Sequence, residues 1–187
     1  MKLAQQRLAA LALLLFAVPA PRLAQAGSAS ASATLRVLPA GGTYPVGAVF
    51  EVVVVMEAAA SLYGADLKLS FDQTRLAVLD ADANTAGVQV TPRGDLLSPD
   101  LVLQRSADNA QGEVRYVVTQ LMPSEPVTGT GALLAFQVQA LAAGPATLAI
   151  DSFLLSDRDG NSLPALTAGA TYTLTTGYTL WAPIAVR

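Results

Sequence analysis

The side chains that could do chemistry in this chain are carboxylates, hydroxyls and a few cations. The sequence of 187 residues contains no histidine and no cysteine. The commonest general base, the strongest nucleophile and the usual zinc ligands are therefore missing. Two carboxylates flanking a cleft could still cleave a glycosidic bond, but the 14 acidic residues are scattered over turns and strand ends. We expect a binding protein that is not an enzyme and has no cofactor.

One acidic cluster invites a metal reading. Asp157-Arg158-Asp159-Gly160-Asn161 places oxygen ligands at a spacing that is similar to a short calcium loop. The cluster lacks the remaining ligand positions and the closing glutamate of an EF-hand, and Asp-Gly-Asn is also a strong hairpin signal. We therefore predict a plain turn and no metal site.

The segment 64–76 carries the polar residues with the most informative spacing. Its polar side chains alternate with apolar ones, as Asp66, Lys68 and Ser70 against Leu67, Leu69 and Phe71. This period of two indicates a half-buried strand. Asp72 then offers its carboxylate to the backbone of a turn, and Leu76 returns to the core. One face of the strand is buried and the other is free to bind.

This segment resembles the cohesin family, the β-sandwich modules that capture dockerin domains on secreted, often polysaccharide-degrading, assemblies. The family typically shows a small residue, an aspartate, alternating apolar residues, an aromatic residue and then Asp-Pro-x-x-Leu, where Gln73 here replaces the proline. The segments 131–138 and 154–164 resemble the family in the same order, so the resemblance spans about residues 34 to 174. It implies a dockerin-like partner, with polysaccharide reached through partner enzymes.

The resemblance also implies where the partner binds. The face would comprise the strand with Asp66, the strand 113–120 and the loop 160–162. In the family an aspartate at the position of Asp66 hydrogen-bonds the dockerin, and a neighbouring asparagine contributes where this chain has Gly64. On the second strand, alternation points one set of residues outward, opposite the core residues Val114, Tyr116 and Val118. The expected partner-binding residues are Gly64, Asp66, Lys68, Arg115, Val117, Thr119, Gly160 and Ser162.

The two ends of the chain differ from its middle. Residues 1–26 contain basic residues, an apolar run over 8–18 and Ala24-Gln25-Ala26, the layout of a secretory signal peptide. We expect a secreted, extracellular or cell-surface protein that begins at Gly27, with no transmembrane segment in the mature chain, because the apolar run is too short to span a bilayer. A Ser/Ala-rich spacer (27–33), a domain (34–175) and an apolar tail (176–187) follow. The tail suits an anchor, an interaction strand or an extra edge strand equally well.

Charge argues against nucleic acid as a partner. Removing residues 1–26 removes three of the 11 basic residues and none of the 14 acidic ones, which leaves a net charge of -6. Binding to phosphates requires clustered lysine and arginine.

The elements that must position these residues are strands. From Thr34 onward, apolar and alternating runs are separated by Gly, Pro, Asn and Asp, without a helical period. We predict an all-β fold, a jelly-roll β-sandwich of about nine strands like that of cohesins and carbohydrate-binding modules. The expected runs are 35–37, 50–56, 64–71, 76–79, 88–90, 101–103, 114–118, 133–138, 148–150 and 172–174, with 39–47 as a turn-rich connection.

Two alternatives to a dockerin-binding module remain open. A carbohydrate-binding module needs coplanar aromatic faces, but the single tryptophan, Trp181, lies in the tail. Tyr116 and Tyr172 alternate with core residues, so Tyr63 beside the binding strand is the aromatic residue of most interest. The other alternative is a structural spacer of a cell-surface protein.

Overall fold

The computed structural model describes residues 32–93 and 96–177, and every regular element in these ranges is a strand. Fourteen strands are present: β1 (Thr34–Leu38), β2 (Gly41–Pro45), β3 (Val49–Leu62), β4 (Gly64–Phe71), β5 (Leu76–Val78), β6 (Val88–Gln89), β7 (Thr91–Pro92), β8 (Leu101–Asp108), β9 (Glu113–Thr119), β10 (Val127–Ala140), β11 (Gly144–Ser156), β12 (Ser162–Leu163), β13 (Leu166–Ala168) and β14 (Ala170–Thr175). The described residues contain no helix long and apolar enough to cross a membrane.

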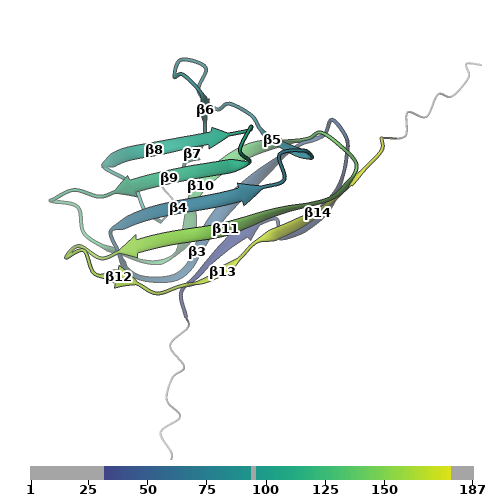
Figure 1. Cartoon of the computed structure of the whole chain (residues 1–187). Helices are drawn as coiled ribbons and strands as arrows, with labels where there is room; N and C mark the ends of the chain where they lie inside the picture. Colours follow the sequence, from purple (N-terminus) through teal and green to yellow (C-terminus); the bar gives the residue numbers. More distant parts are fainter. Residues whose placement is uncertain (1–31, 94–95, 178–187) are drawn as a thin grey trace, which may run out of the picture. The chain divides into compact units, whose positions relative to one another are not determined.

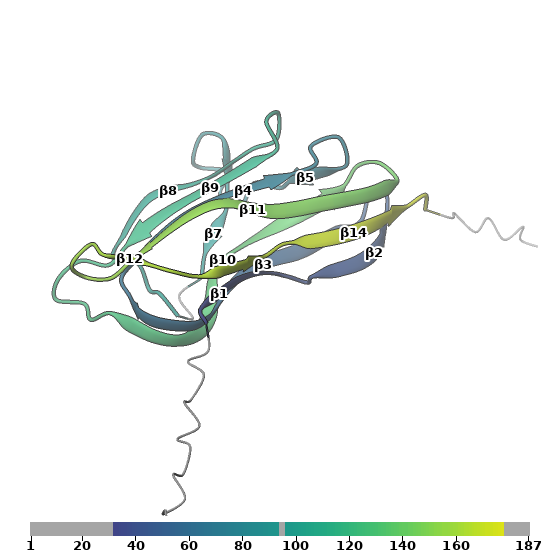
Figure 2. The ribbon, with the colours of Figure 1, turned by 60° about the horizontal axis from the view of Figure 1, so that its bottom comes forward.

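The strands form two sheets that pack face to face (Figures 1 and 2). One sheet has the order β13-β1-β3-β10-β5, with β7 also paired to β10. The other has the order β2-β14-β11-β4-β9-β8-β6, with β12 paired to β11. Figure 2 separates the layers, with β4, β9 and β11 in one and β1, β3 and β10 in the other. The predicted all-β jelly-roll sandwich is therefore confirmed.

The core lies between the sheets and is filled by the inward residues of alternating strands. In β4 and β9 the inward side chains are fully or almost fully buried, as the period of two predicts: Leu67, Leu69, Phe71, Val114, Tyr116 and Val118. In β3 the predicted set is buried too: Phe50, Val52, Val54 and Met56. Each large side chain buried in this way contributes about 1.5–3 kcal/mol.

Two buried tyrosines show how the core accepts polar groups. The hydroxyl of Tyr116 donates to the Leu133 carbonyl at 3.0 Å, and that of Tyr172 donates to the Pro39 carbonyl at 3.1 Å. Burial raises the pKa of Tyr116 to about 12. Both residues occupy the core positions that the sequence predicts.

The turn after β4 also forms as predicted. Asp72 accepts hydrogen bonds from the Thr74 backbone at 3.0 Å and the Thr74 hydroxyl at 2.6 Å, and it pairs with Arg75 at 3.2 Å. The Thr74 hydroxyl is the main cause that lowers the pKa of Asp72. Leu76 then returns to the core, where it is fully buried.

The prediction for residues 39–47 is wrong. Gly41–Pro45 is strand β2, which pairs in parallel with β14. Glycine and proline suggested a turn, but β2 lies at the edge of its sheet, where proline is tolerated. A Cβ atom on Gly41 would lie 2.9 Å from the Thr171 carbonyl oxygen, so glycine here permits close strand approach.

Strand number and length also differ from the sequence prediction. β8 continues to Asp108, well beyond the predicted 101–103, and β7, β12 and β13 are pairings of two or three residues. Such short segments carry too little alternation to be recognised in a sequence.

Candidate functional site

The candidate site is the outer face of β11, β4, β9 and β8, where strand register sets side chains in rows across the sheet. The first row is Ser162, Ser156, Gly64, Thr119 and Leu101. The second is Leu154, Asp66, Val117 and Gln104, and the third is Ser152, Lys68, Arg115 and Ser106. Seven of the eight residues expected from the sequence lie in these rows. Gly160 lies apart, at the tip of the turn between β11 and β12.

The charged side chains of this face are paired with one another. Lys68 lies opposite Arg115, a like-charge pairing, but each cation reaches diagonally to an acid. Arg115 Nη2 lies 3.2 Å from Asp66 Oδ1, and Lys68 Nζ lies 2.7 Å from Glu113 Oε2. The four side chains are 29–40% exposed, so each pair stabilises the fold by only about 0.2–1 kcal/mol. The pairs fix where the charges lie.

Gly64 makes a notch in the first row. It is buried, and a Cβ atom at this position would lie 2.8 Å from Ser156 Oγ and 3.3 Å from Thr119 Oγ1. The Thr119 hydroxyl donates to the Gln120 carbonyl at 3.0 Å. This position therefore offers a partner two neighbouring hydroxyls in place of a side chain of its own.

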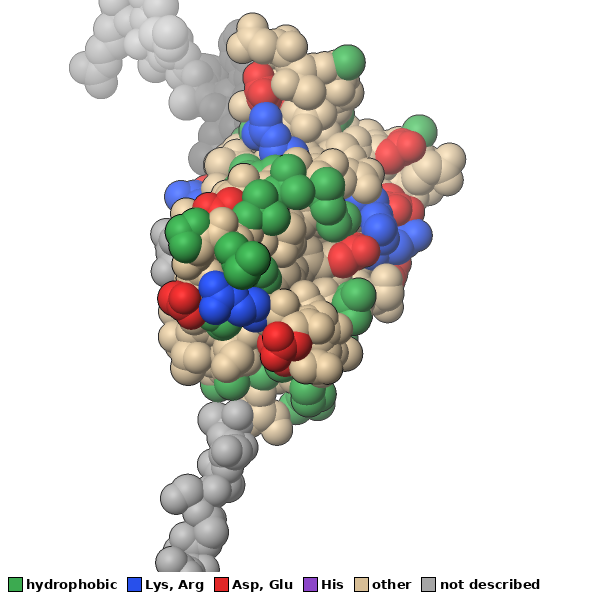
Figure 3. All heavy atoms as spheres, turned by 90° about the vertical axis from the view of Figure 1, so that its left-hand side faces the viewer, with side chains coloured by type: hydrophobic (Ala, Val, Ile, Leu, Met, Phe, Trp, Pro, Cys, Tyr) green, Lys and Arg blue, Asp and Glu red, His purple; other side chains and the backbone are tan. Residues whose placement is uncertain are grey.

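Exposed aliphatic side chains border the charged centre on both sides. Leu154 on β11 is 55% exposed and lies directly opposite Asp66. Across the face are Leu101 and Leu103 of β8, and Leu121 and Met122 follow β9. We call these five residues the aliphatic border. Figure 3, which looks at the end of the domain where β9 and β11 finish, shows hydrophobic side chains gathered beside charged ones.

Sequence reasoning missed this border, although one signal was available. Leu101, Val102 and Leu103 are three consecutive aliphatic residues, which cannot all face the core from one strand. A bulge between Val102 and Gln104 leaves Leu103 65% exposed. Leu154 was hidden by a similar irregularity between Ile150 and Ser152, which shifts the alternation of β11.

Two loops at this end are fixed by hydrogen bonds. Arg158 donates to Glu125 Oε2 at 3.2 Å and to the Ser124 carbonyl at 3.1 Å, and its guanidinium lies 5.8 Å from the centre of the Tyr63 ring. The Leu121 amide donates to Asp100 Oδ2 at 2.7 Å, which is the main cause that lowers the pKa of Asp100. These contacts hold the loop that carries Leu121 and Met122.

The segment 157–161 is a turn, as predicted. Asp157 Oδ1 accepts from the amides of Asp159 at 2.9 Å and Asn161 at 2.8 Å, while Oδ2 accepts from Asn161 Nδ2 at 2.9 Å. The Asn161 side chain is the main cause that lowers the pKa of Asp157. Gly160 has a φ of 83°, which favours glycine. Within residues 32–93 and 96–177, no group of three or more acidic side chains could hold a metal ion.

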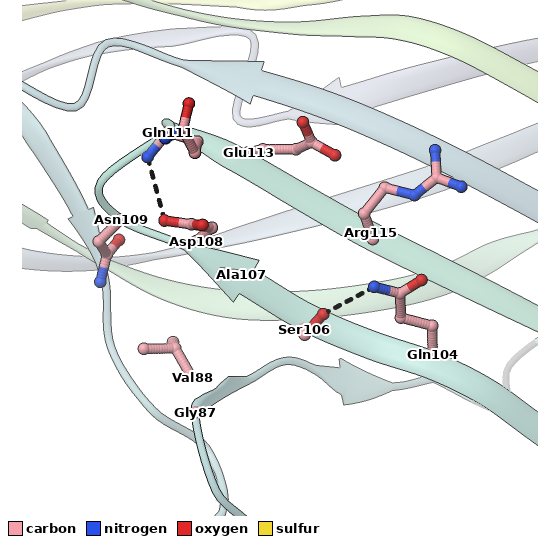
Figure 4. A pocket seen from close by; sticks show the side chains of 10 residues that line it. All are labelled: Gly87, Val88, Gln104, Ser106, Ala107, Asp108, Asn109, Gln111, Glu113 and Arg115. Atoms are coloured by element: carbon pink, nitrogen blue, oxygen red, sulfur yellow. Dashed lines mark hydrogen bonds between the residues drawn. The ribbon is translucent and has the colours of Figure 1, made fainter.

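A hollow of about 540 Å³ lies beside the face (Figure 4). Its polar lining comes mainly from β8 and β9, with Gly87 and Val88 on the far side: Gln104, Ser106, Asp108, Asn109, Gln111, Glu113 and Arg115. Several of these groups already bond within the protein. Gln104 donates to Ser106 at 3.1 Å, and Asp108 accepts from the Gln111 amide at 3.0 Å.

The described residues offer no exposed aromatic platform for a sugar. Tyr63 is only 9% exposed, so the interest attached to it from the sequence does not hold. Tyr116 and Tyr172 are buried in the core, and Tyr44 stacks on Phe50 with ring centres 3.9 Å apart. Trp181 lies outside the described residues.

The sandwich and its flat outer face define a class, a β-sandwich module with one face suited to binding. Neither a scan against protein-family models nor a comparison with curated proteins finds a match. Solved structures of cohesin domains, in contrast, are similar over most of the chain.

One similar structure is a non-cellulosomal cohesin from Archaeoglobus fulgidus, with a TM-score of 0.61, 18% identity, and coverage of 78% of this chain and 93% of that one. A chain of a type I cohesin–dockerin complex from Clostridium thermocellum has a TM-score of 0.64 and 12% identity, covering 78% and 95%. A type II cohesin domain from Acetivibrio cellulolyticus has a TM-score of 0.62 and 13% identity, covering 75% and 95%. The chain therefore has a cohesin-like fold, which confirms the resemblance.

Proposed function

We propose that this protein is a secreted, non-catalytic module that captures a dockerin-like domain on the outer face of β11, β4, β9 and β8. Its role in this proposal is to hold a partner in place, with polysaccharide degradation left to partner enzymes. The lack of histidine and cysteine in the whole chain supports a role in binding.

The observation that carries the proposal is the register of the sheet. Seven residues chosen from the sequence, on three separate segments, lie in three adjacent rows of one face. Asp66 lies near the middle of these rows. Its Oδ1 atom pairs with Arg115, while Oδ2 has no hydrogen-bond partner among the described residues and can accept a bond from a docking domain.

A second line of support is the likeness to the chain from the type I cohesin–dockerin complex of Clostridium thermocellum. The cohesin of another complex, from Clostridium thermocellum as well, also matches, with a TM-score of 0.62 and 10% identity. A flat face of this extent suits docking of a folded domain better than enclosure of a small molecule.

Calorimetric titration tests the proposal. Dockerin modules of the organism that makes this protein are titrated into the exported chain, and we expect saturable one-to-one binding by at least one of them. A glycan array is run with the same preparation. Binding to a glycan with no binding to any dockerin would replace this function with the carbohydrate-binding alternative, and binding to neither would favour a structural spacer.

A further inference from the structure

The charges of the proposed docking face are already satisfied by one another. Asp66 pairs with Arg115 and Lys68 with Glu113, so two cations and two anions cancel at the centre of the face. A charged group arriving from a partner would have to replace a neighbour that is already in place. Exchanging one exposed ion pair for another changes the free energy little, because exposed pairs are weak.

The other acidic groups near the face lie at the end away from the aliphatic border. Asp108 lies opposite Glu113 and accepts hydrogen bonds from the Ala110 and Gln111 amides at 2.8 and 3.0 Å. Asp151 accepts from the Ser70 hydroxyl at 2.6 Å. These two acids are also engaged within the protein, so they offer little attraction to a basic partner.

The aliphatic border offers what the charged centre does not. Met122 is 80% exposed, Leu103 65%, Leu154 55%, Leu121 48% and Leu101 38%. These five are half of the ten exposed large hydrophobic residues in residues 32–93 and 96–177. Exposed apolar side chains that gather beside a flat face mark an interaction site, and methionine adapts easily to a partner surface.

β8 presents its part of the border at an open sheet edge. β6 pairs with β8 only at Ser106 and Ala107, which leaves Leu101–Gln104 without a strand on that side in the described residues. The fixed loop after β9 places Leu121 beside Asp100, at the start of β8. The border is therefore held in position before any partner arrives.

We propose that the partner docks through an apolar surface without excess charge, seated on the aliphatic border, and that it faces Asp66 with neutral hydroxyl or amide donors. This inference rests on the proposed function and specifies the chemistry of the partner. Association then depends on burial of apolar surface rather than on attraction between net charges. Asp66 contributes direction through Oδ2, while Arg115 holds its other oxygen.

The first test is the salt dependence of binding by a dockerin that the titrations identify. Raising NaCl from about 0.1 M to 1 M shortens the Debye length from about 10 Å to about 3 Å. We expect the Kd to stay the same or to fall slightly. A Kd that rises tenfold or more over this range would show that charge attraction drives binding and would overturn the inference.

The second test uses matched leucine variants of the full exported chain. Leu103→Ser and Leu154→Ser remove border side chains, and each is expected to raise the Kd roughly tenfold. Leu166→Ser is the control, because Leu166 is 63% exposed but lies on β13, in the opposite sheet. Thermal melts confirm that all three variants fold.

The outcomes separate the inference from the proposed function. Binding that tolerates Leu103→Ser and Leu154→Ser as well as it tolerates Leu166→Ser overturns the inference and leaves dockerin capture intact. Stronger loss with Asp66→Asn than with both leucine variants also overturns it, because asparagine keeps a neutral acceptor and removes only charge. Failure of every dockerin to bind removes the proposed function itself.

Discussion

Asp66→Ala and Leu67→Ala separate the two faces of β4, because these neighbours point in opposite directions. Asp66 is on the outer face with a side chain 40% exposed, whereas Leu67 is fully buried between the sheets. The first substitution removes an acceptor from the proposed docking face. The second leaves a cavity in the core.

The expected magnitudes differ in opposite senses. Asp66→Ala loses an exposed pair with Arg115 at 3.2 Å, so the free energy of unfolding should fall by less than about 1 kcal/mol. Loss of a hydrogen bond to a charged group should weaken dockerin binding by about 1.5–3 kcal/mol, roughly tenfold to a hundredfold in Kd. Leu67→Ala should lower the free energy of unfolding by about 2–5 kcal/mol.

Calorimetry with a cognate dockerin and denaturant melts measure both quantities on the same preparations. Leu67→Ala should bind with the affinity of the unaltered protein wherever it remains folded. Equal affinity of the unaltered protein and Asp66→Ala would remove the main support at residue level for the docking face. A loss of stability in Asp66→Ala as large as that in Leu67→Ala would show that the assignment of faces is wrong.

Four further predictions follow from the structure. Gly64→Ala should lower stability by about 1–3 kcal/mol, because its Cβ atom would lie 2.8 Å from Ser156 Oγ; unchanged melts would contradict the notch. Tyr116, with a pKa of about 12 against the usual value near 10, should show no phenolate absorbance at about pH 11 while the protein is folded. Its contribution to stability should be complete below about pH 10 and be lost as the pH rises through about 12, so native ionisation near 10 would refute its burial. Calcium or a chelator should leave the melting temperature unchanged, because both oxygens of Asp157 already accept hydrogen bonds, whereas a rise of several degrees with calcium would reveal a site. N-terminal sequencing of the secreted protein should begin at Gly27, and a full-length product retained in the cell would contradict the proposed export.

The sequence predicted best where one face of a strand is buried and the other is not. In β4 the alternation of Leu67 and Leu69 with polar residues reports directly which side chains meet the opposite sheet. The same holds for β9, where Tyr116 lies inward and Arg115 outward. These two strands carry most of the candidate site, which is why the outer face could be assembled from the sequence.

Register and irregularity account for what the sequence could not predict. That Asp66 reaches Arg115 rather than its direct neighbour Val117 depends on pairing between distant segments, and alternation within each strand carries no record of it. The bulge at Leu103 adds one residue and exposes an aliphatic side chain that a regular strand would not. β2 was missed because its stability comes from β14 rather than from its own residues.

The parallel pairing of β2 with β14 has a consequence for the time course of folding. Gly41 lies opposite Thr171, so the pairing closes a loop that contains nearly the whole domain. Loops of this length cost entropy before they return any contact, and folds rich in such distant pairings fold slowly. A chain still emerging during synthesis or export has no β14 against which β2 can form. The sheet can close only when the last strand arrives, so the final step of folding waits for the C-terminal end of the domain.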